Sequence, residues 1–151
     1  MNTNTWKQSG NVYLWRYEEN PRDLQGWHLT ADPKGVLSLL ELIDRMLKSN
    51  GEVRRTIKST TPTNNELRVP SRIKKAISAA KIVLLNKKDA SEYWRISEAQ
   101  GVVTLEAGDR TLGRLKDGLI DIQNNRGDYF IGEKGNELWF WWPSKNDAEP
   151  E

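Results

Sequence analysis

The chain has 151 residues, of which 36% are hydrophobic and 29% are charged, and its formal net charge is +2. This length suits one domain with a buried core, and the composition favours a folded chain over a disordered one. The chain has no cysteine, which excludes disulfides, thiolate metal sites and a cysteine nucleophile.

The sequence predicts neither a membrane span nor an export signal. The longest apolar run, residues 138–142, is far shorter than the roughly 20 residues of a membrane helix. The first six residues lack the basic and apolar regions of a signal peptide. We therefore expect no membrane association and a cytoplasmic location.

The charge is distributed unevenly along the chain. Residues 52–88 carry ten basic and two acidic side chains, whereas residues 89–151 carry seven basic and thirteen acidic ones. Such a local field can steer a charged partner although the whole chain is nearly neutral.

The N-terminal third predicts two strands and a helix. In residues 11–17 three aromatic side chains alternate with three others, as in a strand packed on a core, and residues 26–30 can pair back on it. A helix is expected over residues 33–49, because Asp32 can cap its N-terminus, proline occupies its first position and apolar residues recur at spacings of three and four.

The middle of the chain predicts one further strand and a second helix. Residues 52–59 alternate in the manner of a strand. Residues 71–86 fit either one helix, or a helix that ends near Ala80 and is followed by a buried strand over residues 82–85. We favour the second arrangement, because a β-branched pair lies in the apolar run and an alanine-rich segment precedes it.

Strands fill the predicted C-terminal half. Residues 93–96 and 102–105 predict a hairpin, and residues 119–122 and 128–131 flank another turn signal. The last strand is expected over residues 138–142.

This order of elements predicts an α+β fold with a largely antiparallel sheet, two helices and a strand-rich C-terminal half. A single domain is expected over residues 1–143. Residues 144–151 are polar and acidic, and we expect a flexible tail there.

Tryptophan is abundant, with seven residues in the chain. In the last strand Trp139 and Trp141 share one face, while Leu138, Phe140 and Trp142 share the other. Core packing is the simpler interpretation of both faces. If one face is uncovered, Trp139 and Trp141 are the expected anchors of a partner, because tryptophan provides a large contact area and an N–H group.

The basic segment supplies a second set of candidate partner-binding residues. They are Arg54, Arg55, Lys58, Arg72, Lys74 and Lys75. Such a patch would attract phosphate groups, but the segment lacks the interleaved aromatic residues on which single-strand binders stack bases. A solvated face with intramolecular ion pairs is the simpler interpretation.

The usual catalytic and metal-binding patterns are missing from the sequence. His28 is the only histidine, and a structural role is favoured for it. Asp117, Asp121 and Asp128 are interpreted as solvent-exposed residues near turns, with Asp121 on the outer side of a strand. Three glycines spaced by five are interpreted as turn and bulge positions: Gly108, Gly113 and Gly118. We expect no metal ion, no cofactor and no enzymatic activity.

These features favour a non-enzymatic domain that binds another protein, of the kind represented by small bacterial inhibitors and immunity-type proteins. Such a protein neutralises its target by covering a charged site. The alternative is a nucleic-acid-binding domain that uses the basic segment 52–88, with binding that weakens steeply as salt increases.

Overall fold

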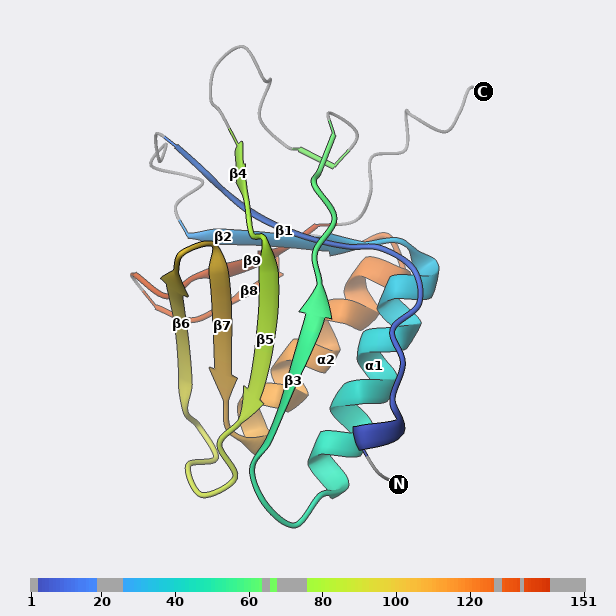
Figure 1. The fold of residues 1–151 in the computed structure, drawn as a ribbon, viewed down its shortest axis with the longest axis vertical. Coiled ribbons are helices and arrows are strands. Elements are labelled where there is room, and N and C mark those ends of the chain that lie inside the picture. Colours follow the sequence, from blue (N-terminus) through green and yellow to red (C-terminus); the bar gives the residue numbers. More distant parts are fainter. Residues whose placement is uncertain are drawn as a thin grey trace.

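A computed structural model describes residues 3–18, 26–63, 66–67, 76–126, 129–133 and 135–141. Within them the chain forms two helices and two mixed β-sheets (Figure 1), so the predicted α+β class is confirmed. A short 3-10 turn, Thr3–Thr5, precedes the first strand.

The larger sheet has five strands in the order β4-β1-β2-β9-β8. In chain order they are β1 (Val12–Tyr17), β2 (Trp27–Ala31), β4 (Ala76–Ser78), β8 (Tyr129–Ile131) and β9 (Leu138–Phe140). β9 runs parallel to β2 and antiparallel to β8, and the other neighbours are antiparallel. The last strand is therefore an interior strand of this sheet, between β2 from the N-terminal third and the edge strand β8.

The smaller sheet has four strands in the order β3-β5-β7-β6. They are β3 (Val53–Lys58), β5 (Lys81–Asn86), β6 (Trp94–Ala99) and β7 (Val102–Ala107), with β5 parallel to β7. The predicted hairpin of β6 and β7 is confirmed. Its turn is made by Gln100 and Gly101, which both have positive φ, 55° and 83°, as a tight two-residue turn requires.

Helix α1 (Pro33–Lys48) forms where the sequence predicts it. The Asp32 carboxylate accepts a hydrogen bond of 2.8 Å from the backbone N–H of Gly35, which caps the first turn. The second helix, α2 (Asp109–Gln123), packs beside α1, and both lie on one side of the smaller sheet (Figure 1).

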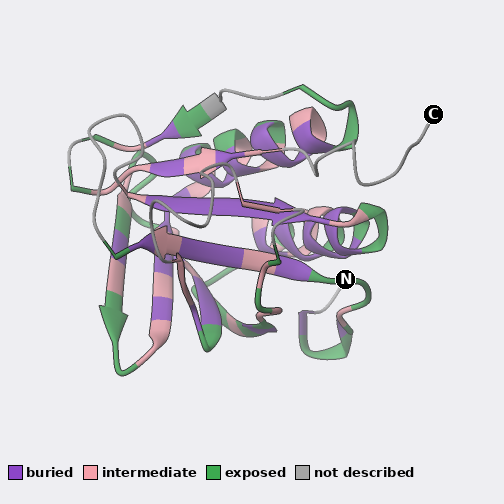
Figure 2. Cartoon of the chain, turned by 90° about the horizontal axis from the view of Figure 1, so that it is seen from above, coloured by how far each residue is buried: buried purple, intermediate pink, exposed green. Residues whose placement is uncertain are grey.

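One hydrophobic core joins both sheets and both helices. It contains side chains from β1, β2 and β9 of the larger sheet, from β3, β5, β6 and β7 of the smaller sheet, and from both helices. Figure 2, which looks onto the larger sheet, shows β1 and β2 buried along most of their length. The expected division at residue 143 stays a prediction, because residues 142–151 lie outside the described residues.

A helix was predicted to end near Ala80, but the described residues of that segment do not form one. Residues 76–78 form β4, which pairs with β1, and residues 71–75 lie outside the described residues. The buried strand expected after it is confirmed as β5. The three residues of β4 gain ladder hydrogen bonds from β1, and this tertiary pairing overrides the helical tendency of the alanines.

The second helix lies instead at 109–123, where the sequence interpretation placed a strand over residues 119–122. Leu112, Leu115, Leu119 and Ile122 are buried at spacings of three and four, which is the helical period. Asp121 is therefore on a helix rather than on a strand. Gly113 and Gly118 lie within α2, and Gly108 is its N-cap residue, so the bulge interpretation of these glycines is wrong.

Gly118 is the point at which α2 meets the last strand. A Cβ atom added there would lie 2.6 Å from the ring of Phe140, which is itself completely buried. Such a distance is impossible without movement of the ring, so the absence of a side chain at position 118 allows the helix to approach β9 closely.

Two glycine substitutions in α2 test this packing. We expect Gly118→Ala to lower the free energy of unfolding by about 1–3 kcal/mol, because the added methyl overpacks against Phe140. Gly113→Ala is the matched control, since nothing lies within 4 Å of its added Cβ. It should raise stability by up to about 1 kcal/mol through helix propensity. Urea denaturation measures both, and equal effects of the two changes would contradict the close contact.

Candidate functional site

A row of residues in direct register crosses all five strands of the larger sheet. Ser78, Trp15, His28, Trp139 and Phe130 are successive cross-strand partners on β4, β1, β2, β9 and β8. Their side chains point away from the core, because the alternate residues of the same strands belong to the core cluster.

The aromatic rings of this row stack together with the ring of Trp141, which lies two residues after Trp139. Ring centroids are separated by 5.7 Å between Trp15 and His28, and by 6.1 Å between His28 and Trp141. The stack continues with 6.2 Å from Trp141 to Trp139 and 4.4 Å from Trp139 to Phe130. The rings of each pair are within 30° of parallel, so five residues form one aromatic ladder.

His28 is the polar member of the aromatic ladder. Its Nδ1 accepts a hydrogen bond of 2.9 Å from the indole N–H of Trp141, and its ring packs against the edge of Tyr17. Because Nδ1 accepts this bond, it carries no proton. The residue is completely buried, so the geometry gives His28 a part in holding the ladder together.

Exposure increases along the ladder. Trp15 and His28 are completely buried, Trp139 and Trp141 are partly exposed, and 45% of Phe130 is exposed on the edge strand. We call the three accessible members, Phe130, Trp139 and Trp141, the aromatic surface. The predicted division of the last strand is confirmed for Leu138 and Phe140, which are fully buried on the other side, whereas Trp142 lies outside the described residues.

A groove of about 570 Å³ adjoins the aromatic surface at Phe130. It lies between the start of β6, the first turns of α2 and the turn that follows β8. Its lining includes Glu92, Trp94, Thr111, Arg114, Phe130 and Glu133. A more open hollow of about 800 Å³ lies at the C-terminal end of α1, but no aromatic side chain lines it.

Polar groups fix the walls of the groove. The Trp94 indole donates a hydrogen bond of 2.8 Å to the carbonyl of Asn136, and the Asn136 side chain accepts one from the Ile96 amide, so the turn after β8 is tied to the smaller sheet. Arg114 lies 3.5 Å from Glu92. The hydroxyl of Thr111 is buried in the wall without a hydrogen-bond partner.

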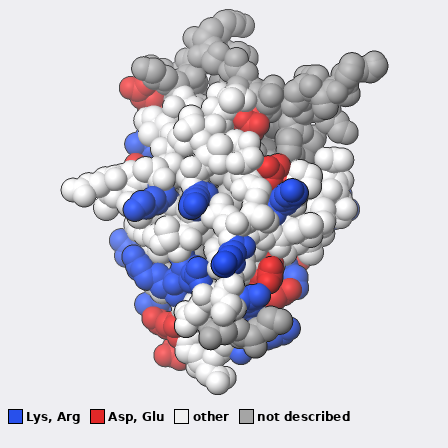
Figure 3. Space-filling view, turned by 45° about the vertical axis from the view of Figure 1, so that its right-hand side comes forward, with Lys and Arg blue, Asp and Glu red and all other residues white. Residues whose placement is uncertain are grey.

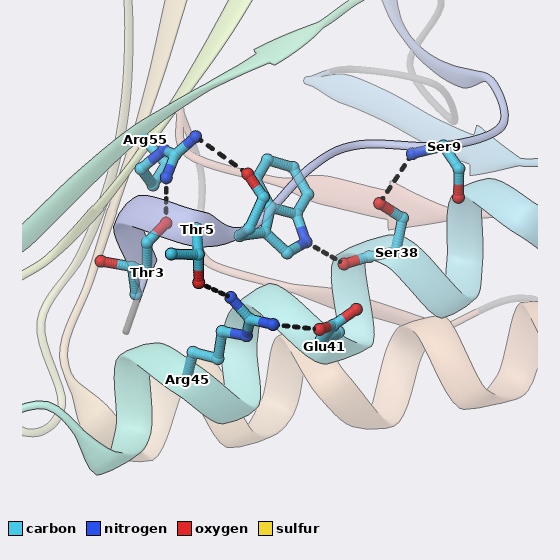
Figure 4. Close-up of polar contacts among 8 residues, drawn as sticks. Thr3, Thr5, Ser9, Ser38, Glu41, Arg45 and Arg55 are labelled. Atoms are coloured by element: carbon cyan, nitrogen blue, oxygen red, sulfur yellow. Dashed lines mark hydrogen bonds and ion pairs between the residues drawn. The ribbon is translucent and has the colours of Figure 1, made fainter. Parts of the chain in front are cut away.

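Arg55, one of the predicted partner-binding residues, is occupied within the chain (Figure 4). Its guanidinium donates hydrogen bonds to the carbonyls of Thr3 and Trp6 and lies over the Trp6 ring, 5.4 Å from its centroid. The Trp6 indole in turn donates to the Ser38 carbonyl of α1 at 2.8 Å. These contacts hold the N-terminal segment between β3 and α1.

The other predicted residues separate into two places. Arg54 and Lys58 are exposed on β3 of the smaller sheet, whereas Trp139 and Trp141 lie on the outer side of the larger one. Arg72, Lys74 and Lys75 lie outside the described residues. Among the described candidates, the aromatic and basic residues thus do not form a common surface.

The aspartates do not assemble a site in the part of the chain that the structure describes. Asp121 forms an ion pair of 2.8 Å with Arg126, Asp117 is exposed on α2 and Asp128 lies outside the described residues. The described residues contain no group of three or more histidine, aspartate or glutamate side chains that could hold a metal ion. Neither helix found in them is long and apolar enough to cross a membrane.

Tyr13 shares the outer side of β1 with Trp15. Burial raises the pKa of its phenol, and the nearby carboxylates of Glu66 and Asp32 raise this pKa further. The phenol therefore stays protonated and uncharged over the physiological range.

Sequence reasoning missed the groove and Phe130. Phe130 carried a signal in its alternation with Ile131, which is buried on the core side. Thr111 and Arg114 were not predicted, because no helix was expected there and the neighbouring Gly108 and Gly113 were interpreted as turn and bulge positions. Comparison of the chain with protein-family models, curated proteins and solved structures found no match.

Two neighbouring arginines test whether Arg55 is structural. We expect Arg55→Ala to lower the free energy of unfolding by about 2 kcal/mol, because it removes charge-assisted hydrogen bonds to two backbone carbonyls. Arg54→Ala, at an exposed position, should change stability by less than about 0.5 kcal/mol. Thermal and urea unfolding of the two variants measure this difference, and an Arg55→Ala protein as stable as Arg54→Ala would exclude the structural role.

Proposed function

We propose that this chain is a protein-binding domain that holds another protein on its aromatic surface. The observation that carries the proposal is the end of the aromatic ladder, where Phe130 is 45% exposed beside Trp139 and Trp141. Aromatic residues are enriched at the centres of protein interfaces, because they bury a large area with few rotatable bonds.

Rigidity of the aromatic surface supports this function. Its rings stack on a buried foundation of Trp15 and His28, and Trp141 is also fixed by its hydrogen bond to His28. Side chains that are already ordered lose little conformational entropy when a partner binds. For the same contacts, a preordered surface therefore binds its partner more tightly than a flexible one.

The adjoining groove supports the same function. Its volume of about 570 Å³ accommodates an anchoring side chain of a partner, and Trp94 and Arg114 in its wall are residue types that often dominate binding energy. The proposal involves no chemical step. A small inhibitor or immunity-type protein, which acts by covering its target, would use such a surface.

The exposed phenylalanine gives a direct test with a matched control. Phe130 and Leu37 are the large hydrophobic side chains most exposed in the described part of the chain, and Leu37 lies on α1, away from the aromatic surface. Tagged wild-type protein, Phe130→Ser and Leu37→Ser are each used to recover partners from the lysate of the native host. We expect a partner that is recovered in stoichiometric amount with wild type and Leu37→Ser.

Recovery of this partner with Phe130→Ser should fall at least tenfold, which corresponds to a loss of about 1.4 kcal/mol of binding energy. Circular dichroism establishes that both variants are folded. A partner retained equally by Phe130→Ser, or a wild-type protein that is recovered alone, contradicts the proposal.

A further inference from the structure

The outer side of the smaller sheet carries four basic side chains that form no ion pair within the residues that the structure describes. Its strands alternate, and the residues that enter the core, such as Ile57, Leu84 and Leu105, define the inner side. The outer side therefore presents four cations: Arg54, Lys58, Lys81 and Arg95. We call this surface the basic sheet face. Figure 3 looks onto the side of the molecule that carries β3 and shows lysine and arginine side chains gathered across its middle.

Two of these cations are direct cross-strand neighbours. Lys58 on β3 is the register partner of Lys81 on β5, and both are exposed. Like charges in this arrangement repel each other and destabilise the strand pair. Within the part of the chain that the structure describes, no side-chain ion pair or hydrogen bond relieves Lys58, Lys81, Arg54 or Arg95.

The centre of the basic sheet face offers hydroxyl groups. Thr56, Thr104 and Ser97 lie in one row across the sheet, between the row of Arg54 and Arg95 and the row of Lys58 and Lys81. Arg54 and Lys58 are separated by four residues of strand, or about 13 Å, and β3 and β6 by three strand spacings, or about 14 Å. Glu106 is the one carboxylate in these rows.

We propose that single-stranded nucleic acid binds across the basic sheet face through its phosphate backbone. The repeated negative charges of a phosphodiester chain can neutralise the four cations of the basic sheet face. The row of hydroxyls can donate hydrogen bonds to phosphate and sugar oxygens. The four cations lie on the face of a four-stranded sheet, whereas the major groove of a duplex admits one helix or a two-stranded ribbon. An extended single strand can instead lie along the flat sheet.

The same face is poorly suited to a membrane surface. Its apolar residues, Val83, Leu85 and Val102, are buried or half-buried. The exposed large hydrophobic residues of the described chain, Leu37 and Phe130, lie elsewhere. Because the face has no aromatic platform, we expect binding to depend on charge rather than on base sequence.

The test is fluorescence anisotropy of a labelled single-stranded oligonucleotide of about 20 nucleotides, titrated with the full chain at several salt concentrations. We expect the logarithm of the association constant to fall with the logarithm of salt with a slope of up to about −2.8, since each of four phosphate contacts contributes roughly 0.7. The double variant Lys58→Gln/Lys81→Gln should weaken binding at least tenfold at low salt and reduce the slope by about 1.4.

The control is Lys34→Gln/Arg110→Gln, which removes the same charge from exposed helix positions outside the sheet and should bind like wild type. Melting temperatures show that the variants are folded, and Phe130→Ser should leave this binding unchanged, which separates it from the proposed protein-binding function. Equal losses in the two double variants, no binding at low salt, or tighter binding to a duplex or to poly-glutamate would each overturn the inference.

Discussion

The insertion of β9 between β2 and β8 is the contact on which the rest of the structure depends. Leu138 and Phe140 are completely buried on its inner side, and Phe140 lies against Gly118, where α2 has no side chain. The same three-residue strand hydrogen-bonds in parallel to a strand more than 100 residues earlier. The end of the described chain therefore unites the larger sheet, α2 and the common core.

The same insertion creates the aromatic ladder. Since side chains alternate along a strand, burying Leu138 and Phe140 directs Trp139 to the opposite side, where His28 and Phe130 are its register partners. The ladder is buried at Trp15 and accessible at Phe130, so the same set of rings provides a structural foundation and the proposed binding surface. The basic sheet face lies on the other sheet, which allows the two proposed binding activities to be tested separately.

The two helices show how much of the fold can be predicted from local sequence. Helix α1 has a capping aspartate, a proline at its first position and a clear apolar stripe, and these local signals agree with one another. Helix α2 has the same period in Leu112, Leu115, Leu119 and Ile122, but it also contains two glycines, Gly113 and Gly118. Position 118 needs a glycine because the ring of Phe140 lies against it, and not because the chain turns there. The sequence of the helix alone does not reveal this tertiary contact.

The sequence by itself determined the α+β class, helix α1, most strands and the division of the last strand into two faces, because each depends on the spacing of neighbouring residues. Tertiary structure alone decided that the strands form two sheets, that β9 enters beside β2 and that Arg55 binds the N-terminal segment. It also placed Lys81 beside Lys58 and brought Arg95 onto the same face of the smaller sheet as Arg54. These outcomes depend on pairings between distant residues, and the energy of such pairings appears only when the chain is closed around one core.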